Sequence, residues 1–238
     1  KPGFAFTCTP AQLRALTGPP ESDGNFPEDF TLLGLYGRIG SLNGNSSWPG
    51  VLRLTPLTDG WQNQLPREVQ SVLKRAEETG TITSAGGELS LNTRERSLKI
   101  LAPKCEVFTF SGTAAGSVMR ITNGSRYQTI ALLSLDGKAL PESRRMLLIQ
   151  LPNQGSSKMK FSNARRNLLE SWGRLPLLLE KCTADVSLAL PEGFELIALK
   201  NNGLPNGRVP LRRINGEYRF KLDSFARKGC VMAYLLTR

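Results

Sequence analysis

The carboxylates of this sequence are its first candidates for chemistry, and two of them share one loop. Asp136 and Glu142 lie in the stretch SLDGKALPESRRMLLIQ, residues 134–150, between two apolar runs. A glycoside hydrolase needs two carboxyl groups that face one sugar, about 5 Å or about 6.5–9.5 Å apart. Asp-Gly is also a strong turn signal, because glycine tolerates a positive φ. Three roles are therefore open for this stretch: a ligand-binding loop, a catalytic pair, or a join between two strands.

The absence of histidine decides much of this choice. It excludes Ser-His-Asp and Cys-His catalysis, His-ligated zinc and histidine pH switching. Carboxylate, lysine or tyrosine chemistry remains open. Glu180, Asp185 and Glu195 lie in strand-like stretches, where we expect them to face solvent. Asp136 reads as a turn residue, so we predict no catalytic residue on this chain alone.

Aromatic side chains that stack on sugar rings are the second kind of candidate. Tyr36, Trp48, Trp61 and Trp172 are the residues that we expect for carbohydrate binding. Trp48 and Trp61 flank a predicted strand in loop-rich sequence, which favours exposure. Trp172 has apolar neighbours, which is typical of a tryptophan packed in a core or against another domain. Packing of this kind is the alternative for all three tryptophans, and we favour it.

The cysteines offer no metal site. Cys8, Cys105, Cys182 and Cys230 are far apart in the sequence and form no CxxC pair. A zinc or iron–sulfur site is therefore excluded, and we expect no metal and no cofactor. We expect mostly buried free thiols, and an even count leaves disulfides open in an exported protein.

The charge of the chain is strongly basic and unevenly placed. The formal net charge is +11; residues 1–80 hold 7 Lys and Arg against 8 Asp and Glu, and residues 81–238 hold 24 against 12. Such a region could bind nucleic acid or an acidic polysaccharide, or the charge could serve solubility, which we favour. Few aromatic residues are interleaved with the arginines, which argues against nucleic acid. No apolar run approaches the roughly 18 residues of a membrane span.

The elements that must position these residues are mostly strands. The pattern predicts a helix from Thr9 to Gly18, strands at 30–39 and 51–57, and a clear helix at 66–80 that Pro66 opens and Gly80 closes. Short strands then follow without crossover helices, at 88–93, 97–103, 104–112, 117–125, 127–135, 145–151, 175–181, 184–190, 194–200, 216–222 and 230–238. This spacing predicts an all-β chain, an antiparallel β-sandwich with a loop-rich N-terminal segment and one short helix, and argues against a parallel α/β fold. We divide it into a connecting segment (1–65), a helix (66–80) and a sandwich domain (81–238).

Residues 80–238 resemble the C-terminal β-rich region of large bacterial glycoside-hydrolase-like proteins. The motifs that carry the resemblance are structural: Ser134–Gly137, Leu140, Ser143–Leu148, Asn153–Gly155, Leu168–Leu178 and Ala184–Leu188. In that family a catalytic (β/α)₈ barrel precedes the β-sandwich modules. The resemblance implies that the acid and the nucleophile would lie on such a barrel, outside these motifs.

The resemblance leads us to expect a non-catalytic accessory domain of a probable glycoside hydrolase. It would brace the catalytic domain of the same polypeptide, with a contact to poly- or oligosaccharide as a further expectation. The alternatives are a free-standing carbohydrate-binding module and a basic domain that binds polyanions or nucleic acid. The first residue is not Met, and no leader sequence is visible, so we expect a processed protein or a fragment. We expect a secreted or periplasmic location.

Overall fold

The computed structural model describes residues 3–6, 28–41, 51–54, 61–164, 166, 168–226 and 229–238. The chain forms two compact units. The first unit comprises residues 1–95 with 159–172, and the second comprises residues 96–158 with 173–238. The helix expected from Thr9 to Gly18 lies outside the described residues. The division at residues 65 and 80 follows element types along the chain and stays a prediction.

The first unit combines helices with short strands. Its elements are β1 (Gly3–Phe6), α2 (Glu28–Tyr36), β2 (Arg38–Ser41), β3 (Val51–Leu54), η1 (Trp61–Gln64), α3 (Arg67–Thr79), β4 (Thr81–Thr83), β5 (Leu89–Asn92), β11 (Lys160–Phe161) and β12 (Leu169–Ser171). β1 lies between β2 and β3 and pairs with both in parallel. α3 confirms the helix expected at 66–80: Val69, Leu73 and Ala76 are buried, and Gly80 ends it with a φ of 72°.

The strand expected at 30–39 is wrong for most of its length. Residues 28–36 form α2, and the strand β2 begins only at Arg38. Pro-Glu-Asp at 27–29 is a typical helix start, and Leu32 and Leu33 are buried in one cluster with the apolar side of α3. A short apolar run fits both a strand and a buried helix, and packing against α3 decides between them here. The described residues therefore contain an α-helix, α2, and a small parallel sheet that we did not expect.

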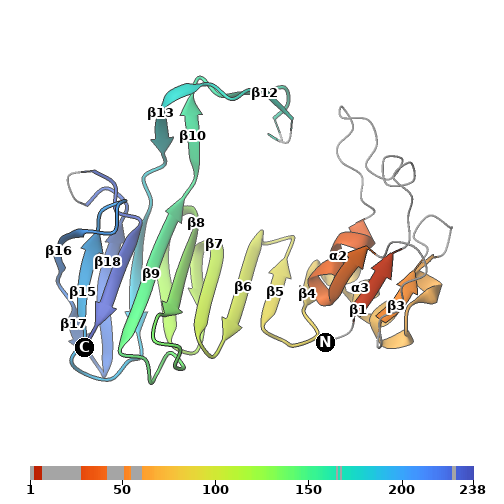
Figure 1. The fold of residues 1–238 in the computed structure, drawn as a ribbon, viewed down its shortest axis with the longest axis horizontal. Coiled ribbons are helices and arrows are strands. Elements are labelled where there is room, and N and C mark those ends of the chain that lie inside the picture. The colour runs from red at the N-terminus through yellow and green to blue at the C-terminus, as the bar shows by residue number, and fades with distance from the viewer. Residues whose placement is uncertain are drawn as a thin grey trace. The chain divides into compact units, whose positions relative to one another are not determined.

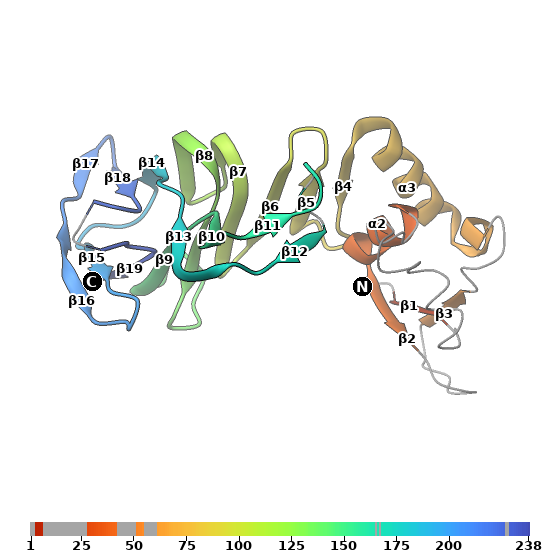
Figure 2. The ribbon, with the colours of Figure 1, turned by 90° about the horizontal axis from the view of Figure 1, so that it is seen from above.

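The second unit is an antiparallel β-sandwich, which confirms the predicted fold class. Its strands are β6 (Ser97–Ala102), β7 (Cys105–Ala115), β8 (Met119–Ser134), β9 (Arg145–Pro152), β10 (Gln154–Ser157), β13 (Arg174–Leu179), β14 (Thr183–Leu188), β15 (Glu195–Leu199), β16 (Pro205–Val209), β17 (Arg212–Ile214), β18 (Glu217–Asp223) and β19 (Ala233–Thr237). One layer has the order β16-β15-β19-β9-β8-β7-β6, and β17-β18-β14 join the start of β8 in the other. Figure 1 shows the strands in sequence colours, and Figure 2 shows β14 and β18 on one side and β9 and β19 on the other.

A single long strand links the two layers. β8 was expected as two strands, but it runs unbroken from Met119 to Ser134; its start pairs with β14 and its end with β9. Between these parts Asn123 adopts a φ of 53°, and the pairing with β7 shifts register near Gly112. A Cβ on Gly124 would lie 2.9 Å from the Gly112 carbonyl oxygen, so only glycine fits there. Bulges of this kind let a strand turn from one sheet to the next.

The core lies between the two layers. Alternate residues point inward, as the pattern of period 2 predicts. The fully buried large side chains of this core are Phe108, Met119, Ile121, Ile130, Leu132, Leu140, Met146, Leu148 and Leu188.

A buried carboxylate fixes the connection between β7 and β8. Glu106 is almost fully buried, and its Oε1 accepts hydrogen bonds from Ser117 N (2.7 Å), Ser117 Oγ (2.6 Å) and Val118 N (2.9 Å). Its Oε2 accepts one from Met119 N at 2.8 Å. A Cβ on Gly116 would overlap this carboxylate. Glu106 therefore satisfies the backbone donors of the turn and has a structural role.

We predict that Glu106→Gln destabilises the second unit. An amide would place N–H groups against backbone donors, and hydrogen bonds to a charged acceptor contribute more than neutral ones. We expect the free energy of unfolding to fall by roughly 2–3 kcal/mol in urea denaturation. The exposed Glu95→Gln is the matched control and should unfold like the wild type. An Glu106→Gln protein as stable as the wild type would contradict this role.

Candidate functional site

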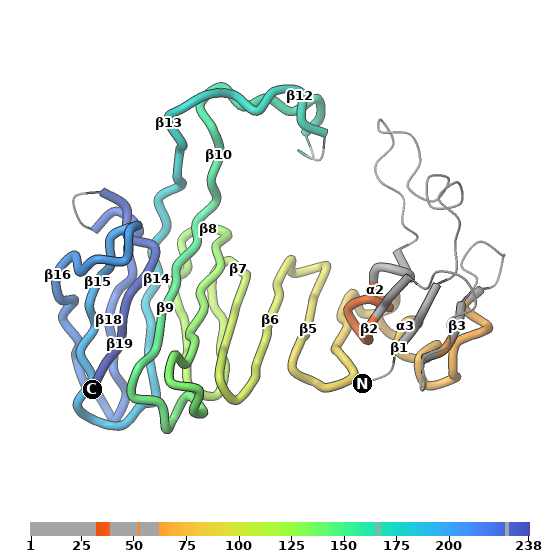
Figure 3. Tube along the Cα trace, in the orientation of Figure 1, coloured from red at the N-terminus to blue at the C-terminus, as the bar shows by residue number. Residues whose placement is uncertain are grey.

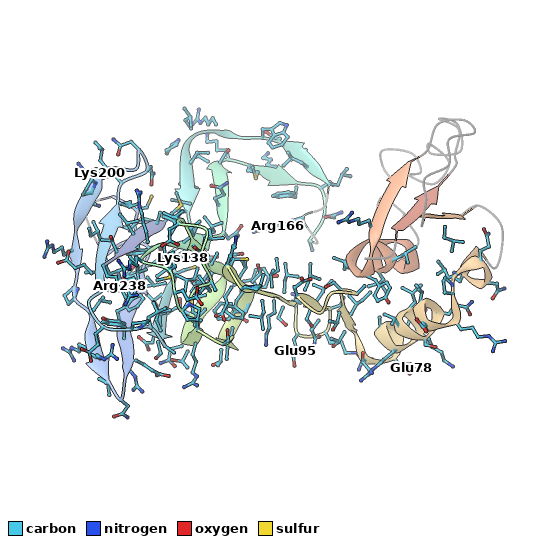
Figure 4. All side chains as sticks on the ribbon, turned by 60° about the horizontal axis from the view of Figure 1, so that its bottom comes forward. Glu78, Glu95, Lys138, Arg166, Lys200 and Arg238 are labelled. Atoms are coloured by element: carbon cyan, nitrogen blue, oxygen red, sulfur yellow. The ribbon has the colours of Figure 1, made fainter. Side chains whose placement is uncertain are left out.

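Asp136 organises the loop that first suggested chemistry. Its Oδ1 accepts hydrogen bonds from the hydroxyls of Ser143 (2.8 Å) and Ser134 (3.0 Å), and its Oδ2 accepts one from Arg144 N (2.8 Å). Lys138 N lies 3.4 Å from Oδ1, and the Lys138 side chain, labelled in Figure 4, marks this turn. The loop is also tied inward, because Leu140 is buried and its N–H donates to the Pro103 carbonyl at 2.8 Å.

These donors determine the chemistry of Asp136. The hydrogen bond from Arg144 N is the largest cause that holds the pKa of Asp136 well below its ordinary range; desolvation opposes it, and the two serines and Lys138 N lower the pKa further. A carboxylate of this kind is a poor proton acceptor at neutral pH. Glu142 is exposed and is not among these partners. The geometry therefore supports the join between two strands, which is the role we favoured.

The expected carbohydrate-binding residues do not come together in one described place. Trp48 lies outside the described residues, and Trp61 begins η1, where only its backbone is described. Tyr36 ends α2 and packs, partly buried, against the cluster of α2 and α3. Trp172 is 77% exposed, so it does not lie in a core of the described residues, and packing against another domain stays a prediction. Its sequence neighbours misled, because the leucines around it are exposed as well.

Those leucines belong to a ribbon of two strands that extends from the sandwich. β9 continues into β10, which pairs with β13, and the two strands project from the sandwich on the side away from Ser134 (Figures 1 and 3). In β13, Leu175 is 79% exposed, Leu177 is 63% exposed and Leu178 is 54% exposed. Opposite them β10 offers only small residues, since Gly155 faces Leu178 and Ser156 faces Leu177. We call residues 154–157 with 174–179 the ribbon.

The ribbon leucines are functional candidates that the sequence reasoning missed. Their stretch was read as an ordinary sandwich strand, but it carries three consecutive leucines (177–179), with no polar residue alternating between them. Consecutive strand residues point to opposite faces, so Leu177 and Leu178 make both faces of the ribbon apolar. Such a pattern is typical of a strand covered on both sides. In the described structure this cover is missing, since all three of Leu175, Leu177 and Leu178 are exposed.

A second surface lies on the outer side of the β17-β18-β14-β8 layer. The register places Arg120, Ser187, Arg219 and Arg212 in one row across the four strands. The adjacent row holds Thr122, Asp185 and Lys221. A hollow of about 550 Å³ is lined by all the residues of these rows except Arg120, together with Val209 and Pro210. We call the seven residues of the two rows the basic face.

The described cysteines are free thiols, as expected, but most of them are not buried, since Cys105 and Cys230 are partly exposed. Cys105, Cys182 and Cys230 are free, and Cys182 is fully buried, while Cys8 lies outside the described residues. Burial, followed by the negative charge of Glu180, raises the pKa of the Cys182 thiol. Among the described residues no group of three or more Cys, Asp or Glu could hold a metal ion. Within the described helices, none is long and apolar enough to cross a membrane.

Comparisons with protein-family models, with curated proteins and with solved structures find no match to this chain. The β-sandwich fold is therefore established by the structure itself. The resemblance to glycoside-hydrolase-like proteins stays a hypothesis.

We predict that Asp136→Asn destabilises the loop in a pH-dependent way. At pH 7 the variant should unfold at a lower urea concentration than the wild type, because its amide nitrogen would face Arg144 N. The folded-state pKa of Asp136 is lowered, so its stabilisation is complete above 3.8, the ordinary pKa of the carboxyl, and is lost as the pH falls below that value. The difference between variant and wild type should therefore narrow at pH 3. Glu142→Gln is the control, and an equal pH effect there would refute the assignment.

Proposed function

We propose that this chain is a non-catalytic accessory region of a glycoside-hydrolase-like protein, and that its ribbon braces the catalytic domain of the same polypeptide. The observation that carries the proposal is the exposure of Leu175, Leu177 and Leu178 on both faces of the ribbon. The resemblance of residues 80–238 to the modules that follow a catalytic barrel supplies the partner.

The energetics of the ribbon support a covering partner. An isolated pair of strands is marginal in water, and polar Gln154–Ser157 gives β13 little apolar surface to pack on. Full burial of a leucine contributes about 1.5–3 kcal/mol, and the exposed parts of the three leucines amount to about two full side chains, so a domain that covers them would gain roughly 3–6 kcal/mol. Exposed apolar surface of this kind marks an interaction site in soluble proteins.

The fold of the first unit also supports the proposal of a neighbouring α/β domain. α2 lies in the sequence between the parallel neighbours β1 and β2, which makes a β-α-β unit. Parallel sheets occur almost only in domains whose sheet faces are covered by helices, and (β/α)₈ barrels are built from this unit. A parallel sheet of three strands is small for such a domain. It fits the proposal that part of the chain belongs to, or packs against, a larger α/β domain.

A free-standing carbohydrate-binding module is the second candidate, because Trp172 offers an exposed indole. An exposed tryptophan can stack on a sugar ring or pack against a protein. Saturable binding of a neutral glycan that is abolished by Trp172→Ala, and unchanged by serine substitutions in the ribbon, would favour the module over the brace.

We predict that the ribbon is covered in the full polypeptide. Amide hydrogen exchange should be fast at 154–157 and 174–179 in the isolated chain, and slowed at least about tenfold in the protein translated from the whole reading frame. The triple variant Leu175→Ser/Leu177→Ser/Leu178→Ser should not show this slowing. It should also bind more weakly to the rest of the polypeptide when the two are expressed as separate proteins.

The control uses other exposed apolar residues of the second unit. Leu135→Ser/Leu204→Ser removes two exposed leucines outside the ribbon and should leave both readouts unchanged. Equal exchange of the ribbon in the isolated chain and in the full polypeptide would disprove the brace. Hydrolysis of an aryl glycoside by the isolated chain would disprove its non-catalytic role.

A further inference from the structure

The basic face combines cations in a way that costs stability. Arg212 and Arg219 stand directly opposite each other on β17 and β18. Side chains at such positions are close neighbours, and like charges there are destabilising. Arg219 has a partial remedy, an ion pair with Glu217 in which Nη2 and Oε2 are 3.7 Å apart. The Arg212 side chain has no ion pair or hydrogen bond among the described residues, so an anion bound between the two guanidinium groups would relieve the repulsion.

The row continues beyond this pair. Ser187 lies between Arg219 and Arg120 in the cross-strand register, and all three arginines are exposed. Neighbouring strands are about 4.8 Å apart, so the row from Arg120 to Arg212 extends for roughly 14 Å. An extended ligand with more than one acidic group can reach all three guanidinium groups at once. A single small anion cannot.

Asp185 gives the basic face a second kind of group. Its Oδ2 accepts a hydrogen bond from Asn123 Nδ2 at 2.7 Å, which holds the carboxylate in the hollow beside Lys221. A carboxylate repels the acidic groups of any polyanion, but it accepts hydrogen bonds from sugar hydroxyls, which a polysaccharide carries and the DNA backbone lacks. The hydroxyls of Thr122 and Ser187 add donors and acceptors of the same type. The ring of Phe220 belongs to the buried core, so the described lining presents no aromatic ring on which a base could stack.

From these groups we infer that the basic face binds an acidic polysaccharide. The arginines pair with carboxylate or sulfate groups of the glycan, for which guanidinium geometry is suited. Asp185, Ser187 and Thr122 bond its hydroxyl groups. The basic face and the ribbon share no residue, so this inference does not depend on the proposed brace. DNA would use the arginines, but its backbone offers no hydroxyl groups to offset the repulsion by Asp185.

The test measures binding to the purified chain by fluorescence anisotropy. Four labelled probes of matched length are used: oligogalacturonate as the carboxylated glycan, dextran sulfate as the sulfated glycan, neutral dextran, and single-stranded DNA. Binding is measured at about 50 mM and about 200 mM NaCl. We expect at least one acidic polysaccharide to bind, neutral dextran not to bind, and the acidic complex to weaken with salt. Arg212→Gln/Arg219→Gln should weaken that complex about tenfold or more, since hydrogen bonds to charged groups are lost. Saturation with the ligand should also raise the melting temperature of the wild type.

Two control variants separate this site from general charge and from nucleic acid. Lys99→Gln/Lys104→Gln removes two exposed positive charges elsewhere in the same unit and should change the affinity less than about threefold. Asp185→Asn should weaken the binding of the acidic polysaccharide and strengthen the binding of DNA. The inference is overturned if the two double variants weaken binding equally, if Asp185→Asn strengthens the polysaccharide, or if DNA binds more tightly than both acidic polysaccharides. The serine variant of the ribbon should bind normally, so failure of the brace and failure of this site are distinguishable.

Discussion

The close approach of two backbone segments, at Gly112 and Gly124, is the constraint on which the sandwich depends. Only a residue without a Cβ fits at Gly124, and next to it Asn123 takes a left-handed conformation. The turn that results carries β8 from one layer into the other. β14 then pairs with the start of β8, and β9 pairs with its end. The position of both layers is therefore set by this one strand. The two inner faces consequently meet over the apolar core.

The same crossing also positions the polar groups of the second unit. Asn123 donates to Asp185, and Ser125 Oγ accepts from Thr183 N at 2.9 Å, so the bend is fastened to β14 by side chains. Glu106 fastens the other end, where β7 turns into β8. Hydrogen bonds at a bend of this kind fix which face of each strand is outward. The arginine row is a consequence, because its register depends on where β8 begins.

The sequence alone predicts most strands of the two layers, but it does not predict the helix α2 or the exposure of Trp172. The strand pattern located nine of the twelve strands of the second unit and missed β10, β16 and β17, while Asp-Gly alone identified Asp136 as a turn residue. α2 was missed because four apolar residues in a short run suit a strand equally well, and contact with α3 is a tertiary effect. The exposure of Trp172 could not be predicted from its apolar neighbours in the sequence. Apolar neighbours indicate burial only when some other part of the chain covers them.

The two-faced ribbon has a consequence for the order of assembly. A strand pair that is apolar on one face can lie on a flat surface, whereas one that presents Leu177 and Leu178 to opposite sides needs a cleft that encloses it. If a domain encloses the ribbon as we propose, it has to hold its cleft open, or close it around the ribbon, after the sandwich has made β10 and β13 neighbours. The proposal then implies that the last folding step of each part waits for the other.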